Sequence, residues 1–317
     1  MSEGGRFMIF KRITFEYVLY EWLESRKDSI KESSFNKYMF SIKKYLVPYL
    51  GNYEFRKLKE KNIFEFYEQE EISKLGNSTK NILLIIIQSS ISYSIEKKYR
   101  KNLLDLDIKF KKKKNEITYF TKKEQDIIEE YINNNMNIRN LSILFSLYTG
   151  VRIGELCALK GTDIDFVNNT VSIDKTVQRV KNTDGKSKTK LIIGKPKTKT
   201  SIRVIPVPEF VIKHLKKYIK DKDNFIFTGN DKPKDPRTLE KYFSELLDRL
   251  NIKQNNFHSL RHTFATRLRE QKVDIKVISE LLGHSSWKFT QDIYVHASFE
   301  SKKHSVNILG KIRKRSS

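Results

Sequence analysis

The sequence predicts a mainly α-helical protein with a small β-sheet or hairpin, made of an N-terminal helical domain and a C-terminal mixed α/β domain. Apolar residues recur at helical spacing through most of the 317 residues. The period changes to an alternation of apolar and polar residues between 170 and 208, and a lysine run separates the two parts. A chain of this length has room for roughly two domains, each with its own core.

The N-terminal domain is expected over 14–104, after a short arm of residues 1–13 that has little periodicity. Thr14 is suited to cap the first helix, because its hydroxyl can accept a hydrogen bond from the first turn. Four stretches carry apolar residues at helical spacing: 15–23, 35–46, 62–69 and 78–99. The last of them is apolar almost all round at its centre, which is typical of the middle of a helical bundle.

The segment 105–116 is expected to be a basic linker, because it has a lysine run without apolar periodicity. The run consists of Lys111, Lys112, Lys113 and Lys114. Two interpretations stay open for these side chains. They either lie along the phosphates of a nucleic acid or form a solvated spacer without contacts.

The C-terminal domain is expected over 117–317 and combines helices with strands. Helical patterns cover 121–132, 141–160 with an interruption at Gly150, 209–219, 236–250, 258–270, 274–284 and 286–296. Apolar and polar residues alternate over 170–180 and 190–208, and the polar stretch between them is typical of a turn. We therefore expect a β-hairpin inside an otherwise helical domain.

The composition favours a polyanionic partner. The chain has 62 Lys and Arg against 38 Asp and Glu, a formal charge of +24 and a pI near 9.8. Lys, Asn and Ile are abundant, so coding bias is an alternative source of part of this excess, and charge alone does not establish nucleic-acid binding. A membrane partner is not expected, because the longest apolar run, 82–87, is far shorter than the ~20 residues that span a bilayer.

Cysteine usage indicates a reducing compartment. Cys157 is the one cysteine of the chain and so cannot form an internal disulfide. It lies in an apolar helical pattern, where a free cysteine usually packs as a small hydrophobe. We expect a cytoplasmic protein with Cys157 buried.

The stretch "HSLRH" at 258–262 holds two of the six histidines around an arginine. In a helix, His258, Arg261 and His262 share one face. A zinc site is not expected, because Ser259 stands where a zinc-protease motif needs Glu and an arginine repels a cation. We interpret His262 as a packed core residue, and His258 with Arg261 as donors to a phosphate.

Further residues of the same chemistry lie elsewhere in the chain. Arg152 follows a glycine in "TGVRIGEL", and Glu155 one turn later is placed to orient its guanidinium. His284 comes just after a helix-ending "LLG", and Tyr294 lies ten residues further on. Taken alone, each has an ordinary structural explanation, such as a surface ion pair for Arg152.

Together these residues resemble the signature of the tyrosine recombinases, the phage-integrase family of site-specific DNA recombinases. The motifs "TGVRIGELCALKGTDIDF", "HSLRHTFAT", "LLGHSS" and "YVH" occur in the family's order, and the resemblance covers nearly the whole chain. It implies a SAM-like core-binding domain, a linker and a catalytic domain. It also implies a catalytic lysine in the hairpin, which "PKTKTSIR" places at Lys197, with Lys199 as the nearest rival.

The resemblance gives each residue a role. The implied catalytic residues are Arg152, Lys197, His258, Arg261, His284 and Tyr294, supported by Glu155. The arginines and histidines would stabilise the phosphate, Lys197 would protonate the leaving oxygen, and Tyr294 would be the nucleophile. Residues expected to contact DNA are Lys111, Lys112, Lys113, Lys114, Lys199 and Arg203.

The implied reaction proceeds through a 3′-phosphotyrosine and a Holliday junction and needs neither metal nor ATP, so no cofactor is expected. The implied partners are double-stranded DNA recombination sites and three further copies in a homotetramer on synapsed DNA. An accessory DNA-bending or directionality factor stays open. The segment after Tyr294 is a candidate for docking on a neighbouring copy.

Two departures from the family pattern do not affect the chemistry: Gly161 replaces a large aromatic, and the hairpin turn is long. Residues 1–13 are too few for an arm-binding domain, so binding to distant arm sites is not expected. We favour an integrase of a mobile element. The alternatives are an Xer-like dimer resolvase or an invertase and, more remotely, a non-catalytic DNA-binding protein or a type IB topoisomerase-like enzyme.

Overall fold

The computed structural model describes most of the chain as two compact units. The described residues are 13–111, 118–182, 189–196 and 198–284. Among the described residues, one unit comprises 13–111 with 180–182, and the other comprises 118–179 with 189–196 and 198–284. Each unit has a hydrophobic core of its own.

The first unit is all-helical. Its elements are α1 (Phe15–Ser25), α2 (Glu32–Ser41), a π-helical turn (Ile42–Leu46), α3 (Val47–Leu50), a 3-10 turn (Phe55–Lys57), α4 (Glu60–Glu68), α5 (Glu70–Ser73) and α6 (Asn77–Glu96). Thr14 caps α1 as predicted, with its Oγ1 accepting from the N–H of Tyr17 at 3.3 Å. The periodicity therefore predicted α1, α2, α4 and α6, but not the short helices α3 and α5.

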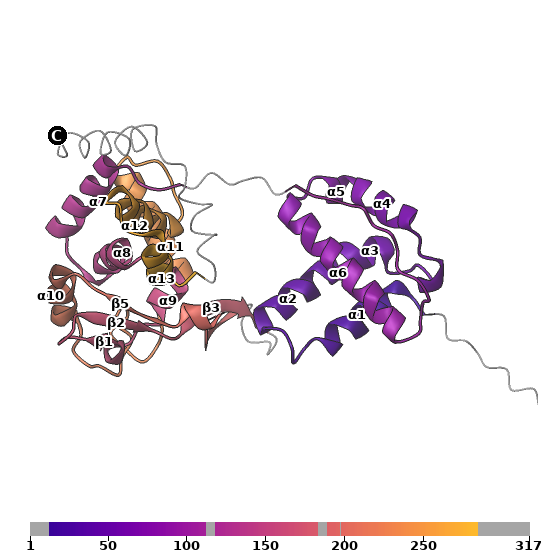
Figure 1. Cartoon of the computed structure of the whole chain (residues 1–317), viewed down its shortest axis with the longest axis horizontal. Coiled ribbons are helices and arrows are strands. Elements are labelled where there is room, and N and C mark those ends of the chain that lie inside the picture. Colours follow the sequence, from indigo (N-terminus) through magenta and orange to yellow (C-terminus); the bar gives the residue numbers. More distant parts are fainter. Residues whose placement is uncertain (1–12, 112–117, 183–188, 197, 285–317) are drawn as a thin grey trace, which may run out of the picture. The chain divides into compact units, whose positions relative to one another are not determined.

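Helix α6 forms the centre of this unit and packs against α1 and α2 (Figure 1). Leu83, Ile86, Ile87 and Ile91 on its inner face are buried. Ile85 in the same apolar run is 48% exposed, so the run has an outward face as well. No described helix of either unit is both long and apolar enough to cross a membrane.

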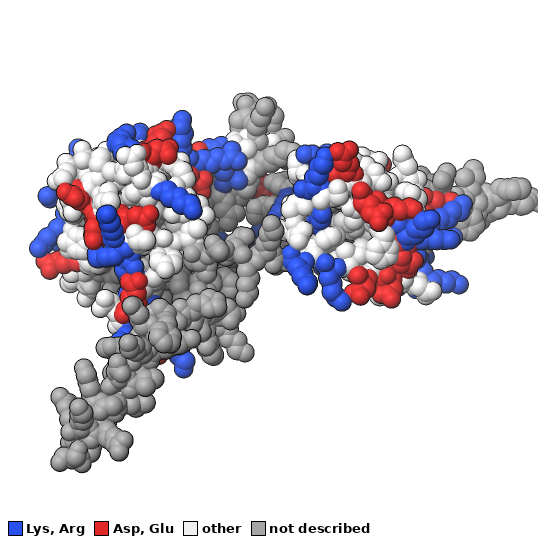
Figure 2. Space-filling view, turned by 90° about the horizontal axis from the view of Figure 1, so that it is seen from above, with Lys and Arg blue, Asp and Glu red and all other residues white. Residues whose placement is uncertain are grey.

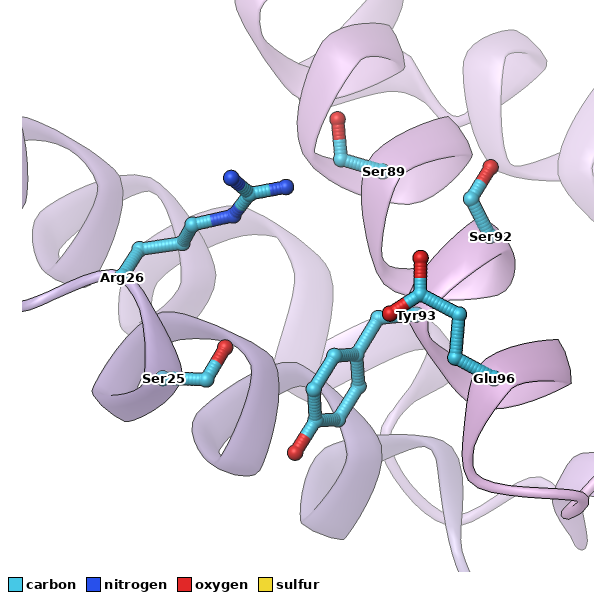
Figure 3. Close-up of a pocket in the computed structure, with 6 residues that line it drawn as sticks. All are labelled: Ser25, Arg26, Ser89, Ser92, Tyr93 and Glu96. Atoms are coloured by element: carbon cyan, nitrogen blue, oxygen red, sulfur yellow. The ribbon is translucent and has the colours of Figure 1, made fainter. Parts of the chain in front are cut away.

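A pocket of about 590 Å³ opens between the end of α1 and the second half of α6 (Figure 3). Its lining residues are Ser25, Arg26, Ser89, Ser92, Tyr93 and Glu96. The guanidinium of Arg26 points from α1 toward the serines of α6 (Figure 3). None of the residues that the sequence indicates for chemistry lies in this pocket.

The second unit combines helices with two small sheets. Its helices are α7 (Lys122–Asn134), α8 (Ile138–Thr149), α9 (Ile153–Cys157), α10 (Glu209–Tyr218), α11 (Pro236–Arg249), α12 (His258–Glu270) and α13 (Ile275–Leu282). Its strands are β1 (Ile164–Asp165), β2 (Thr170–Ile173), β3 (Thr176–Lys181), β4 (Thr189–Gly194) and β5 (Arg203–Pro206), with 3-10 turns at Gly161–Asp163 and Lys199–Ser201.

Helix α8 is the core of the second unit, because α7, α9, α10, α11 and α12 all pack against it (Figure 1). It ends at Gly150, whose φ of 63° lies in the left-handed region that favours glycine. The predicted interruption of the helical pattern at Gly150 is thus confirmed. Cys157 at the end of α9 is 1% exposed, as predicted, and burial raises the pKa of its thiol to about 12.

The two alternating segments pair with each other as predicted for a hairpin, but the pairing is divided between two sheets. Each segment divides into two strands: β2 pairs with β5 and β1 in one antiparallel sheet, and β3 pairs with β4 in another. The division after β2 falls at Asp174 and Lys175, where the Lys175 ammonium binds the carboxylate of Asp163 at 2.6 Å. The alternating period continues across this break, so the sequence pattern does not reveal it.

Gly161 follows α9 at a place where a side chain does not fit. A Cβ built on Gly161 would lie 2.7 Å from Cα and 3.0 Å from the carbonyl oxygen of Lys222, and 2.9 Å from the side chain of Ile219. The N–H of Gly161 donates to the carbonyl of Asn224 at 3.2 Å, which holds the two segments together. Close backbone approach therefore explains the glycine at this position.

We expect Gly161→Ala to lower the free energy of unfolding by about 1–3 kcal/mol, because its Cβ would push against backbone. Gly194→Ala is the matched control, since a Cβ there meets nothing within 4 Å. Chemical denaturation of both variants measures the difference. Equal stability of the two variants would contradict the packing argument.

Candidate active site

Three consecutive carbonyl groups at the end of α13 each accept a hydrogen bond from a different arginine. The pairs are Arg203 Nε with Leu281 O at 2.7 Å, Arg261 Nη2 with Leu282 O at 2.6 Å, and Arg152 Nη2 with Gly283 O at 3.2 Å. The last carbonyls of a helix have no partner within the helix and carry its partial negative charge. They are therefore favourable acceptors for guanidinium groups, and they gather residues from distant parts of the sequence.

Arg261 is the most deeply buried of the three. It lies in the first turn of α12 and is 2% exposed. Its Nη1 donates to the carbonyl of Gly150 at 2.6 Å, at the end of α8. One guanidinium thus joins the ends of two helices, α8 and α13.

Arg152 stands at the N-terminus of α9 and remains 35% exposed. Its Nη1 donates to Glu155 Oε1 at 2.7 Å, and its backbone N–H donates to Glu155 Oε2 at 3.0 Å. The spacing of these two residues predicted that Glu155 would orient the guanidinium, and the two contacts agree with it. Arg152 is held in place while part of its side chain stays open to solvent.

Arg203, which the sequence assigned to DNA contact, lies next to Glu155. Its side chain is 7% exposed and faces the carboxylate of Glu155 rather than solvent, with Nη2 to Oε2 at 2.9 Å and Nη1 to Oε1 at 3.2 Å. This geometry does not favour the DNA contact that the sequence indicated. The buried carboxylate that binds Arg203 lies 48 residues away in the chain.

Glu155 is almost fully buried and stays ionised. Burial raises the pKa of its carboxyl, but hydrogen bonds from Arg203 and the charges of Arg203 and Arg152 outweigh this and hold the pKa below its usual range. A buried carboxylate needs such partners to remain charged.

Two histidines lie together at the start of α12. The rings of His258 and His262 are perpendicular, with centroids 4.7 Å apart. His258 is exposed in part, whereas His262 is half-buried, in line with the packing role expected for it. Loss of hydration, with the positive charge of Arg261 as a smaller cause, lowers the pKa of both to about 4.

His284 follows the end of α13 directly. Its backbone N–H donates to Ser279 O at 3.1 Å, and that of Gly283 to Glu280 O at 2.9 Å, which is the Schellman arrangement that ends a helix at a left-handed glycine. Burial lowers the pKa of His284 to about 3, with Arg261 and Arg152 adding repulsion.

The remaining predicted residues are not part of this cluster of arginines and histidines in the described residues. Lys112, Lys113, Lys114, Lys197 and Tyr294 lie outside the described residues. Lys111 is exposed, and its carbonyl accepts from the Asn77 side chain at 2.8 Å. Lys199 begins the 3-10 turn before β5.

The sequence did not predict that the carbonyls at the end of α13 bind the arginines. The signal in the sequence was "LLG", which marks the end of a helix. In the described ranges, no group of three His, Cys, Asp or Glu side chains is arranged to hold a metal ion. The arrangement is instead a cluster of cations and imidazoles, which suits an anion.

The family models cover most of the chain. A model of the phage integrase family matches residues 118–301, and a model of the N-terminal SAM-like domain of phage integrases matches residues 14–70. The chain belongs to the phage integrase family. All the arginines and histidines described above, from Arg152 to His284, lie within the first match.

Relatives of this chain include a XerC-like tyrosine recombinase of Caldanaerobacter subterraneus, 31% identical over 95% of this chain and 83% of that protein. The integrase of Staphylococcus phage L54a is 28% identical over 91% of this chain and 90% of its own. Both alignments extend over both units.

Solved structures share the fold. The Tn1549 transposon integrase in complex with transposon right end DNA has a TM-score of 0.78 at 21% identity, over 94% of this chain and all of that one. A lambda integrase tetramer bound to a Holliday junction has a TM-score of 0.65 at 17% identity, over 92% of this chain and 80% of that one.

The lowered histidine pKa values predict a loss of stability on mild acidification. The unfolded chain protonates these side chains below their ordinary pKa of about 6.5, whereas the DNA-free folded site protonates His258 only near about 4 and His284 near about 3. Because the unfolded state then binds more protons, the free energy of unfolding falls as the pH drops through this window.

Thermal denaturation at about pH 7.5 and about pH 5 measures the effect. Both pH values lie above the range in which most carboxylates titrate. We expect a lower melting temperature at the lower pH and a smaller drop for His284→Gln. A melting temperature that is unchanged or higher near pH 5 would contradict the neutral state of these imidazoles.

Proposed function

We propose that this protein is a site-specific DNA recombinase that cuts and rejoins strands through a 3′-phosphotyrosine, in the service of a mobile element. Membership of the phage integrase family supports the reaction class. The observation that carries the proposal is that Arg152 and Arg261 donate hydrogen bonds to the carbonyls at the end of α13, near His258 and His284. Such a site offers donors to a phosphate without a bound metal.

The chemistry needs positive charge at a fixed place. Displacement at a phosphodiester spreads negative charge over the phosphoryl oxygens in the transition state. Arg152, which is partly exposed, would donate to these oxygens directly. Arg261, which is buried, would contribute its positive charge from within the protein. Both Arg261 and His258 lie in the first turn of α12, where the helix dipole also favours an anion.

Tyr294 would be the nucleophile and Lys197 the general acid. Their support is the order and spacing of the motifs in the sequence. The phosphotyrosine bond preserves the energy of the DNA backbone, so the free 5′-hydroxyl of another strand can rejoin it without ATP. His258 and His284 would donate to the phosphate once its charge favours their protonation.

The partners we propose are double-stranded recombination sites and a homotetramer assembled on them. The Tn1549 and lambda integrases of like fold were solved with transposon end DNA and as a tetramer on a Holliday junction. The domains we propose are 14–104 for core binding and 117–317 for catalysis. On the face drawn in Figure 2, basic and acidic side chains are intermingled, so this view does not locate the DNA surface.

An Xer-like role in resolving DNA dimers is the second candidate. The observation in its favour is the XerC-like relative, which aligns over nearly the whole chain. Sequencing the DNA that becomes covalently attached to the protein in its host separates the two. Element ends would support the integrase, and a chromosomal or plasmid resolution site would support the resolvase.

We expect Tyr294→Phe to abolish the covalent protein–DNA adduct and to leave DNA binding nearly unchanged, because it removes one oxygen from a site otherwise held by charge. Denaturing gels with suicide substrates detect the adduct. Tyr119→Phe, at a tyrosine that is 46% exposed, is the control and should form it normally. An adduct at full yield in Tyr294→Phe would identify another nucleophile.

Lys197→Ala should cleave ordinary DNA very slowly but recover on a 5′-bridging phosphorothioate, whose sulfur leaves without a proton. Arg152→Ala, which removes charge rather than a proton donor, should not recover. Single-turnover cleavage of both substrates gives the comparison. Recovery by Lys199→Ala instead of Lys197→Ala would move the general acid by two positions.

A further inference from the structure

Arg203 makes more contacts to the site than a surface residue of a hairpin would. Its guanidinium donates to both oxygens of Glu155, to Leu281 O at 2.7 Å and to Ser201 O at 3.0 Å. These acceptors belong to three segments: α9, the end of α13, and the turn that precedes β5. Arg203 itself begins β5, so one side chain connects the sheet to both helices.

Two positive charges surround the single negative charge of Glu155. The carboxylate is 3% exposed and lies between two guanidinium groups, one from Arg203 and one from Arg152. Arg203 binds both of its oxygens, whereas the side chain of Arg152 binds Oε1. The three groups therefore carry one net positive charge, and Arg152 is the more exposed of the two arginines.

We propose that Arg203 is a positioning residue that neutralises Glu155, so that Arg152 is oriented by the carboxylate and still presents a positive charge to the scissile phosphate. This inference rests on the proposed function. Without Arg203, the buried carboxylate would face Arg152 alone, and their charges would cancel at the place where the phosphate binds. In a buried site this cancellation is strong, because water screens little of it.

The ionisation of Glu155 supports this assignment. Burial raises the pKa of its carboxyl, and the largest opposing influence is the hydrogen bonding and charge of Arg203, ahead of Arg152. Arg203 is thus the main counter-charge of the carboxylate.

Packing places Arg203 against the segment that carries His284. A Cβ built on Gly283 would lie 3.0 Å from Cδ and 3.1 Å from Nη1 of Arg203, and 3.1 Å from the carbonyl oxygen of Thr200. Arg203 therefore fills the space beside the end of α13 and helps to fix the residue that follows it.

The test compares Arg203→Met with the double variant Arg203→Met/Glu155→Gln. The single variant should lower single-turnover adduct formation about tenfold or more, because it leaves an unpaired carboxylate beside Arg152. Glu155→Gln removes the negative charge and keeps the shape. The double variant should therefore cleave several-fold faster than the single one, with rates taken on DNA-bound protein well below its melting temperature.

Two further variants separate positioning from general stability. Arg203→Lys retains the charge without the planar fork and should fall between wild type and Arg203→Met. Arg267→Met is the matched control, since Arg267 also binds a carboxylate, Glu270, and a carbonyl, Phe120 O, but outside the site. It should lower the melting temperature and keep adduct formation near the wild-type rate.

A double variant no faster than Arg203→Met, or an Arg203→Met as fast as Arg267→Met, would overturn the role of Arg203. Wild-type protein that forms no Tyr294-dependent adduct would overturn the proposed function itself, so the two failures are distinct.

Discussion

The end of α13 is the constraint on which the rest of the site depends. Its last three carbonyls need hydrogen-bond donors from outside the helix, and the guanidinium groups of Arg152, Arg203 and Arg261 supply them. Each arginine comes from a different element, so the short helix brings α9, β5 and α12 to one point. A buried guanidinium requires acceptors in turn, and a helix C-terminus offers several in one place.

Elements with a local chemical signal were predictable from the sequence. The caps at Thr14 and Gly150 and the helix end before His284 follow from the conformations that these residues favour. Arg152 and Glu155 lie three residues apart, so their contact could also be predicted. The catalytic roles of these residues came from the resemblance to the family, because hydrophobic periodicity carries no information about catalysis.

The remaining features depend on contacts between distant residues. The burial of Arg203 is set by a carboxylate in another element, and nothing in "PKTKTSIR" indicates that one of its cations turns inward. The break between β2 and β3 has a similar cause, because the partner of Lys175 is Asp163 outside the strand. Alternation of apolar residues reports which face is buried and is silent about which strand is the neighbour.

The arginines bind backbone carbonyls rather than side chains, and this has an evolutionary consequence. Leu281 and Leu282 contribute their oxygens rather than their side chains to the guanidinium contacts, so drift at these two positions leaves the acceptors in place. Selection would instead preserve the point at which the helix stops, which Gly283 determines. Homologues can therefore differ along α13 and still share its geometry, and a comparison of side chains alone would overlook the acceptors that they have in common.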